Sequence, residues 1–175
     1  MKRAAVSPGP ARKRSPRALR ESPDPAAPIE VRAVRRGDLD SVIDLDATVT
    51  GVEKRKYWLS VYRRYGSGEH DEQQFLVALR EARVVGFIIG EVRDWEFGSA
   101  PCGWVFAIDV DPRVREAGVG TLLLRAIAAR FERIGVRMLR TIVARENTLI
   151  LSFFRSQGLR AGRLIPLELE VGAPS

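Results

Sequence analysis

Two kinds of hydrophobic periodicity follow one another at the start of the patterned part of the chain. Residues 29–34, I-E-V-R-A-V, alternate apolar and polar side chains, which is typical of a half-buried strand. Residues 35–50 place apolar side chains at helical spacing, with Asp38 near the start as a candidate cap, and a second helical stretch follows over 53–65. This region is therefore predicted as one strand followed by two helices.

Three strand-like runs come next. Residues 74–80 and 84–93 are rich in large apolar side chains and are separated by a short turn at 81–83. Such spacing is typical of an antiparallel hairpin. A loop that contains two glycines and a proline then leads to a third apolar run at 104–110.

The last third of the chain alternates helices and strands. Its clearest helix covers 119–134, where one stripe of apolar side chains persists over four turns. Residues 138–144 are predicted as a strand, and Asn147 can cap the short helix that follows. The segment 164–171, L-I-P-L-E-L-E-V, is predicted as a strand, which Pro166 places at an edge or a bulge.

The positive charge is concentrated at one end. The chain has 175 residues and a net charge of +7, and residues 1–28 hold seven basic and two acidic side chains together with six prolines. Such a segment cannot bury enough apolar surface to fold, so we expect a disordered tail at 1–28 and a folded domain at 29–175. The tail either attracts nucleic acid or acidic partners or has no dedicated role. Because the excess charge lies there, it does not predict specific nucleic-acid binding by the domain.

Composition excludes several kinds of site. One cysteine, Cys102, excludes an intrachain disulfide and a thiolate metal cluster. One histidine, His70, excludes a multi-histidine metal site and argues against a histidine-based triad, so no metal is expected. The sequence has neither the apolar run of a secretory signal nor one of ~20 residues that would span a membrane. We therefore expect a soluble, cytoplasmic protein.

The strand–glycine–helix unit at 104–134 carries the clearest chemical signal. A loop of small residues before a helix exposes unpaired backbone N–H groups at the positive end of the helix dipole, where phosphate groups bind well. Gly118 and Gly120 would let a pyrophosphate approach the backbone, and Arg115 adds a positive charge. The spacing fits neither the dinucleotide nor the triphosphate glycine loop. The alternative is that the two glycines only make a tight turn.

This unit resembles a known family. The run V-D-P-R-V-R-E-A-G-V-G-T-L-L-L at 110–124 is similar to the acetyl-CoA-binding motif R/Q-x-x-G-x-G/A of the Gcn5-related N-acetyltransferases (GNAT), and its three defined positions are the arginine and two glycines just named. The run E-N-T-L-I-L-S-F-F-R-S-Q-G-L at 146–159 resembles the family's second motif. The resemblance covers 29–171 and implies a three-layer α+β fold, in which a mixed, mostly antiparallel twisted sheet is flanked by helices.

The resemblance also implies acetyl-CoA as co-substrate and where it binds. The backbone of 108–110 is expected to lie along the pantetheine arm, and the amides of 115–121 to hold the pyrophosphate. Asn147 is expected to face the pantetheine or the leaving thiol, or to act as a helix cap, or both. The implied binding residues are Ile108, Asp109, Val110, Arg115, Glu116, Ala117, Gly118, Val119, Gly120, Thr121 and Asn147.

The usual acid and base of the family are absent from their usual places. Many members carry a tyrosine on the second-motif helix that protonates the departing thiolate, whereas the matching residue here is Phe154, which has no proton to donate. Many members also carry a glutamate base near the start of the strand before the glycine loop. Here that stretch reads Cys102-Gly103-Trp104.

Glu91 and Asp109 are the remaining candidate catalytic carboxylates. Glu91 is in register with apolar residues of its strand, and apolar surroundings raise the pKa of a carboxyl group toward that of a useful general base. The alternative is that Glu91 pairs with an arginine such as Arg93 or Arg140. Asp109, on the central strand, is the second candidate, and its alternative is a structural acceptor.

Two functions follow from the resemblance. The first is an N-acetyltransferase that moves an acetyl group from acetyl-CoA directly to a primary amine of a small molecule or a protein. The second is a non-catalytic acyl-CoA sensor with the same fold. The missing tyrosine and glutamate favour the sensor, and the usual activity of the family favours the enzyme. The expected partner is an amine acceptor, with no specific nucleic acid and no membrane, and a homodimer is left open.

Overall fold

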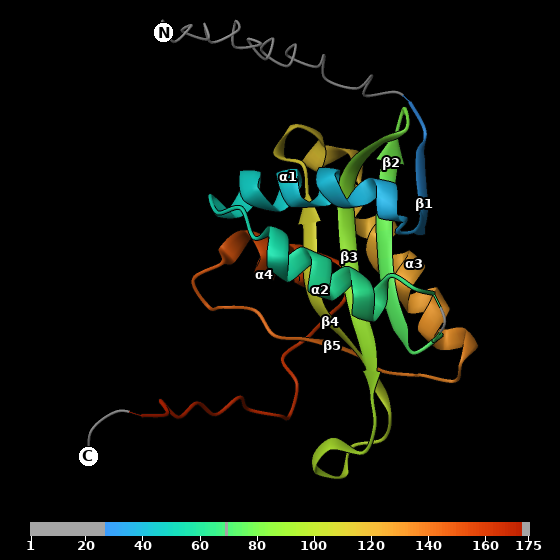
Figure 1. Ribbon diagram of the computed structural model, residues 1–175. Helices are drawn as coiled ribbons and strands as arrows, with labels where there is room; N and C mark the ends of the chain where they lie inside the picture. Colours follow the sequence, from blue (N-terminus) through green and yellow to red (C-terminus); the bar gives the residue numbers. More distant parts are fainter. Residues whose placement is uncertain (1–26, 69, 173–175) are drawn as a thin grey trace, which may run out of the picture.

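A computed structural model of the chain describes residues 27–68 and 70–172 (Figure 1). Nearly all of the predicted tail, residues 1–26, lies outside them. Five strands form one sheet in the order β1-β2-β3-β4-β5. They are β1 Ile29–Ala33, β2 Gln73–Arg80, β3 Arg83–Arg93, β4 Cys102–Val110 and β5 Leu139–Thr141. The helices are α1 Leu39–Thr50, α2 Arg55–Tyr65, α3 Val119–Arg133 and α4 Thr148–Ser156, with short 3-10 turns at Arg36–Asp38, Glu96–Gly98 and Pro112–Ala117.

The sheet is mixed and mostly antiparallel, as predicted. Strands β1 to β4 pair antiparallel with their neighbours in the sequence, and β2 and β3 form the expected hairpin. Only β5 runs parallel to β4, and the two pair over just three residues, Gly103–Val105 opposite Leu139–Thr141. Beyond Val105, β4 continues to Val110 without β5 beside it. The two strands therefore separate at the point where the candidate site begins.

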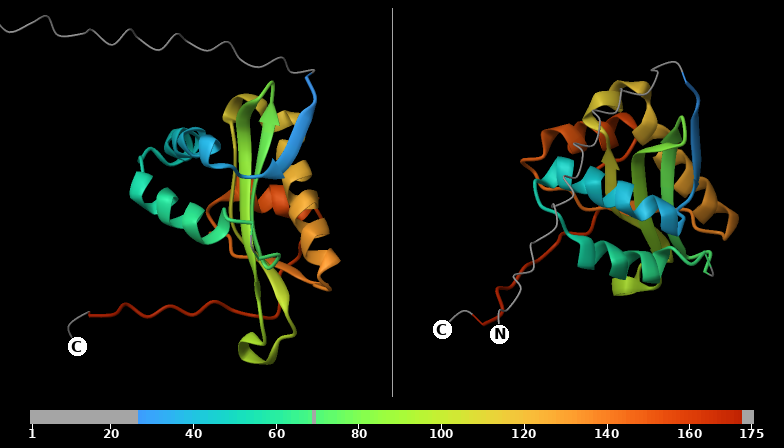
Figure 2. Two further views of the ribbon diagram at one scale, coloured as in Figure 1. Left: turned by 45° about the vertical axis from the view of Figure 1, so that its right-hand side comes forward. Right: turned by 45° about the horizontal axis from the view of Figure 1, so that its top comes forward.

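Helices cover both faces of the sheet, which confirms the three-layer arrangement. Figure 2 shows α1 and α2 on one face and α3 and α4 on the other. Alternate residues of β2 divide between the two cores: Phe75 and Val77 pack with α1 and α2, whereas Leu76 and Ala78 pack with α3 and α4. Because both faces are buried, the central strands have continuous apolar runs rather than an alternation of apolar and polar residues.

Helix α3 lies close to the sheet because three glycines beneath it, Gly86, Gly90 and Gly103, have no side chain. A Cβ atom on Gly86 would lie 3.1 Å from a methyl group of Val119, and one on Gly103 would lie 2.6 Å from the ring of Phe131. Real Cβ atoms essentially never approach to 2.6 Å, and 3.1 Å is tighter than nine in ten of their contacts, so larger residues at these strand positions would push the helix outward. The packing thereby fixes the N-terminus of α3 beside the end of β4.

Three predicted elements differ in the structure. The strand expected over 138–144 is paired only at Leu139–Thr141, because the chain then turns away from β4. The strand predicted at 164–171 is absent: the segment is extended but has no partner strand among the described residues. Asp38 does not cap α1, because its carboxylate instead binds the Arg32 guanidinium and the Arg35 backbone N–H.

Among the helices of residues 27–68 and 70–172, none combines the length and apolar character needed to cross a membrane.

Candidate active site

A cavity of about 800 Å³ opens where β4 and β5 separate. Its walls come from both sides of the sheet: Asp46, Lys54 and Trp58 belong to the α1–α2 side, and the glycine loop and α4 belong to the other. Residues 105–110 of β4 lie between these two sides. The cavity therefore connects two ends, one at the glycine loop and one at helices α1 and α2.

Asp111 shapes the turn at the glycine-loop end. Its buried carboxylate accepts a hydrogen bond from the Arg113 backbone N–H at 2.9 Å and binds the Arg113 guanidinium through both oxygens, at 2.6 Å from Nη2 to Oδ2. These contacts hold the pKa of Asp111 below its ordinary value. The Asp-Pro pair that follows the third apolar run in the sequence is thus a structural anchor for the loop.

The N-terminus of α3 presents free backbone N–H groups to the cavity. Gly118 precedes the helix with a left-handed backbone, φ 72°, which glycine adopts without strain. The first intrahelical hydrogen bond runs from Leu122 N–H to the Gly118 carbonyl at 3.0 Å. The amides of residues 119–121 therefore have no acceptor within the helix. Since Gly120, Thr121 and Arg115 line the cavity, this end is suited to a phosphate group.

Asp109 lies on β4 between the two ends of the cavity. Burial raises the pKa of its carboxyl group to about 6, and the negative charge of Asp46 adds to this effect, while the positive charges of Lys54 and Arg115 oppose it. A carboxylate with a pKa near 6 is ionised at neutral pH but holds a proton more readily than an exposed aspartate. Asp109 can therefore accept a proton from a group bound beside β4.

Asp46 is a site residue that the sequence analysis missed. It is buried, and its two oxygens accept hydrogen bonds from Lys54 Nζ and from the Trp58 indole N–H, both at 2.9 Å. These bonds join α1 to the start of α2 at the cavity wall. The available signal was its position: Asp46 follows Leu39, Val42 and Ile43 at helical spacing, which places a carboxylate on the apolar face of a helix.

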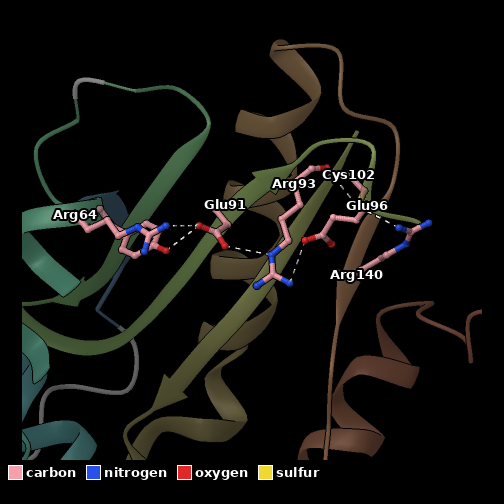
Figure 3. A network of polar contacts seen from close by, with 7 residues as sticks. Arg64, Glu91, Arg93, Glu96, Cys102 and Arg140 are labelled. Carbon is pink, nitrogen blue, oxygen red and sulfur yellow. Dashed lines mark hydrogen bonds and ion pairs between the residues drawn. The ribbon is translucent and has the colours of Figure 1, made fainter. Parts of the chain in front are cut away.

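Glu91 lies in a different polar network (Figure 3). Its carboxylate accepts a hydrogen bond from the Tyr65 hydroxyl at 2.8 Å and one from Arg93 Nε at 3.1 Å, and Arg64 lies 3.8 Å away. Glu91 is not among the residues that line the cavity. Burial, followed by the bond to Glu91, raises the pKa of Tyr65 to about 12. The alternative role considered for Glu91, an ion pair with Arg93, is thus present in the structure.

The second arginine considered for Glu91 has another partner. Arg140 Nη1 lies 3.2 Å from the sulfur of Cys102, which is buried at the start of β4. Within the described residues, no group of three or more His, Cys, Asp and Glu side chains is arranged to hold a metal ion.

Helix α4 forms the remaining wall. Asn147 caps it, since its Oδ1 accepts a hydrogen bond from Ile150 N–H at 3.2 Å, and Asn147 also lines the cavity. Phe153 and Phe154 both line the cavity. Phe154, at the position where many members of the family that this chain resembles carry a tyrosine, is only 3% exposed, whereas Phe153 is half-buried and lies against Gly120. A Cβ atom on Gly120 would lie 3.0 Å from the Phe153 ring. The glycine loop and α4 are therefore in direct contact.

Most predicted coenzyme-binding residues meet in one place. The cavity is lined by Ile108, Asp109, Val110, Arg115, Gly118, Gly120, Thr121 and Asn147. Ala117 and Val119 are not part of the lining, and the side chain of Val119 is buried in the core, so only its backbone amide is available to a ligand. The side chain of Glu116 lies outside the described part of the chain.

Comparison with known proteins gives one family. The sequence model of the acetyltransferase (GNAT) family matches residues 39–159. A search of curated protein sequences finds no match.

Solved structures share the fold at low sequence identity. A CoA complex of the aminoglycoside N-acetyltransferase AAC(6')-Iy is 18% identical, with a TM-score of 0.72 over 83% of this chain and 96% of that one. The aminoglycoside 6'-N-acetyltransferase AAC(6')-Ih from Acinetobacter baumannii is 13% identical, with a TM-score of 0.70 over 83% of this chain and 100% of that one. A transcriptional regulator from Bacillus halodurans C-125 is 14% identical, with a TM-score of 0.69 over 81% of this chain and 99% of that one.

Proposed function

Because the chain belongs to the acetyltransferase (GNAT) family, we propose that it transfers an acetyl group from acetyl-CoA directly to a primary amine. One observation carries the proposal: a single cavity joins a helix N-terminus, which is suited to a phosphate group, to a carboxylate, Asp109, whose pKa is raised to about 6. Coenzyme and acceptor would enter from opposite ends and meet at β4.

The residues at the loop end fit the coenzyme. Its pyrophosphate would bind the free amides of 119–121, with Arg115 supplying positive charge. Beyond Val105, the edge of β4 that faces β5 has no strand partner among the described residues. Backbone N–H and C=O groups on this edge can therefore bond the amides of the pantetheine arm as a neighbouring strand would.

The acceptor end suits a cationic amine. Asp109 would take a proton from the ammonium group, directly or through a water molecule, and leave a neutral amine. The nitrogen then attacks the thioester carbonyl, a C–N bond forms, and a backbone N–H of β4 near Val110 would stabilise the oxyanion. As the C–S bond breaks, the nitrogen loses its second proton to water, and the thiolate takes a proton from water or from protonated Asp109, because Phe154 has none to give. The products are an N-acetylated amine and free CoA.

A non-catalytic acyl-CoA sensor is the second candidate. It is favoured by the phenylalanines on α4, where the family has a phenol, and by the engagement of Glu91 with Tyr65 and Arg93. A sensor needs the loop end of the cavity but has no need for a carboxylate of raised pKa at its centre. The raised pKa of Asp109 therefore favours the enzyme over the sensor.

The test is a screen for release of CoA thiol from acetyl-CoA with polyamines, aminoglycosides, amino acids and peptide amines. With an accepted amine, Asp109→Asn should lower turnover by roughly 10²-fold or more. Glu91→Gln is the matched control, since it also neutralises a carboxylate on a central strand, and it should keep a near-normal rate per folded molecule. A loss of turnover in Glu91→Gln with a near-normal rate in Asp109→Asn would instead identify Glu91 as the base. Tight coenzyme binding without turnover of any amine would favour the sensor.

A further inference from the structure

The face of β4 that carries Asp109 continues along the strand toward a group of polar side chains. Asp109 and Ala107 pair with residues of β3 that pack under α1 and α2, and Trp104 pairs with Glu91, which bonds Tyr65 of α2. Directly paired residues of antiparallel strands point to the same face, so all three β4 side chains lie on the α1–α2 side. A β-bulge accounts for the odd spacing between residues 107 and 104. Asp109 and Trp104 are therefore two points on one surface.

A pair of donors without acceptors lies just beyond the cavity. The cavity lining reaches β4 and β5 as far as the paired residues Val105 and Thr141, and the next pair along the two strands is Trp104 and Arg140. Arg140 is half-buried, and its guanidinium contacts the sulfur of Cys102 at 3.2 Å but no carboxylate among the described residues. The indole N–H of Trp104 is buried and has no acceptor either. Buried donors are nearly always paired in folded proteins, so an acceptor is missing at this point.

The neighbouring arginines already have acidic partners (Figure 3). Arg93 binds Glu91 at 3.1 Å and reaches Glu96 at 4.0 Å, and Arg64 lies 3.8 Å from Glu91. In this view Arg140 lies beyond Glu96, at the other end of the group from Arg64. Three guanidinium groups thus face two carboxylates, and the group as a whole carries an excess of positive charge.

Resting on the proposed function, we propose that the amine acceptor is an extended peptide whose terminal amine lies beside Asp109 and whose carboxylate, four or five residues further along, binds Arg140. Strand residues rise ~3.3 Å each, so Asp109 and Trp104 are roughly 13–16 Å apart, the lower value allowing for the bulge. An extended peptide of four or five residues covers the same length. Since a carboxylate has two oxygens, the second can bond the Trp104 indole N–H once the side chains that cover it move aside.

The surface between the two points suits a peptide. Ala107 is small and leaves room for a peptide backbone, and Phe106 is 39% exposed at the cavity wall, where it offers apolar contact to a peptide side chain. A polycationic amine such as an aminoglycoside fits less well, because a second ammonium group near Arg140 would be repelled. The charge of Arg140 therefore selects for acceptors that are acidic at this distance from the amine.

The first test compares acceptors that differ in charge alone. They are tetra-alanine with a free C-terminal carboxylate and tetra-alanine with a C-terminal amide, with a polyamine and an aminoglycoside assayed beside them. We expect kcat/KM for the acid peptide to exceed that for the amide by about tenfold or more, because a hydrogen bond to a charged group is lost in the amide. Both polycationic amines should be poorer acceptors than the acid peptide.

Variants of Arg140 assign the preference to one side chain. Arg140→Met should raise KM for the acid peptide by the same factor, with kcat nearly unchanged and with KM for the amide unaffected. Arg140→Lys, which keeps the charge, should retain part of the preference. Arg137→Met is the matched control, because it removes a positive charge from the same segment, where Arg137 is 81% exposed and faces Glu132; it should keep the full preference.

A binding measurement separates this inference from the proposed function. Calorimetry of CoA-saturated protein should show N-acetylated tetra-alanine bound more tightly as the acid than as the amide, and equally in Arg140→Met. Turnover without an acid preference, a preference that survives Arg140→Met, or turnover confined to polycationic amines would overturn the peptide inference and leave acetyl transfer standing. No turnover, with the acid product still bound through Arg140, would overturn the proposed function but keep the carboxylate site. No turnover and no such binding would overturn both.

Discussion

The indole N–H of Trp58 donates a hydrogen bond of 2.9 Å to Asp46, a carboxylate that is only 3% exposed. Together with Lys54, it keeps the negative charge of Asp46 in place beside the cavity, where that charge helps to raise the pKa of Asp109. The hydrogen bonds that join α1 and α2 therefore influence the protonation of Asp109, which lies on β4.

A change at Asp46 should consequently shift the pH dependence of turnover. Asp46→Asn removes a negative charge near Asp109 and releases Lys54 from its partner, and both effects favour ionised Asp109. We expect the pKa of Asp109 to fall from about 6 toward its ordinary value of 3.8, so the acid limb of the pH–rate profile moves to lower pH. Asp40→Asn, on the exposed side of the same helix, is the control and should leave the limb unchanged. An unmoved limb in Asp46→Asn would rule out this coupling.

Asp109→Asn should stabilise the fold while it lowers turnover. The pKa of Asp109 is 3.8 in the unfolded chain and about 6 in the folded protein. At pH values between these two, the folded state therefore holds the proton of Asp109 more tightly than the unfolded state does. The cost of ionising Asp109 is thus fully present above pH ~6 and absent below pH ~4. The full difference corresponds to about 3 kcal/mol, and screening by solvent leaves about 1–2 kcal/mol.

Denaturant unfolding of both proteins at pH 7 and pH 4 measures this gain. The asparagine variant should be more stable at pH 7, with the difference fading at pH 4. A variant that is less stable than the wild type at pH 7 would mean that Asp109 is a favourable structural acceptor.

The contact between the glycine loop and α4 should control coenzyme affinity. In Gly120→Ala, the added methyl group would lie 3.0 Å from the Phe153 ring, so the loop must shift. We expect calorimetry to show acetyl-CoA binding weakened by about tenfold, or ~1.4 kcal/mol. A second change, Phe153→Leu, should restore part of the loss, which a double-mutant cycle would detect. Gly37→Ala, where a Cβ meets no atom within 4 Å, is the control; equal affinity in both alanine variants would contradict the prediction.

The two phenylalanines of α4 should respond differently to an added hydroxyl. Phe154→Tyr places an oxygen in the core, and an unpaired buried hydroxyl costs about 1–3 kcal/mol, so the unfolding free energy should fall. Phe153→Tyr should cost little, because both residues line the cavity but Phe153 is only half-buried, whereas Phe154 is 3% exposed. Thermal unfolding compares the two. A stable Phe154→Tyr variant with raised turnover would instead show that its hydroxyl reaches the leaving thiolate.

Local patterns in the sequence predicted the parts of the fold that depend on neighbouring residues. The β2–β3 hairpin follows from two apolar runs around a short turn, and the start of α3 after a left-handed residue follows from the glycine at 118. In these cases the interacting groups lie within a few residues of one another. Their geometry is therefore determined by a single short stretch of sequence.

Contacts between distant segments were not predictable in the same way. Glu91 was expected on an apolar face, yet Tyr65, 26 residues earlier, supplies the hydroxyl that satisfies it. Asp46 and Trp58 meet only because α1 and α2 pack against each other. Residues 164–171 have the pattern of a strand, but a pattern of alternation does not specify which edge a strand joins.

Because α3 packs closely against the sheet, a displacement at one end of this helix is transmitted to its other end. Gly103 touches it near Phe131, twelve residues from Val119, a length of about 18 Å along the helix axis. A side chain added at Gly103 would tilt the helix and move the backbone amides at its N-terminus, which we propose bind the pyrophosphate. Coenzyme affinity is thus open to adjustment by residues beneath the helix that no ligand ever touches.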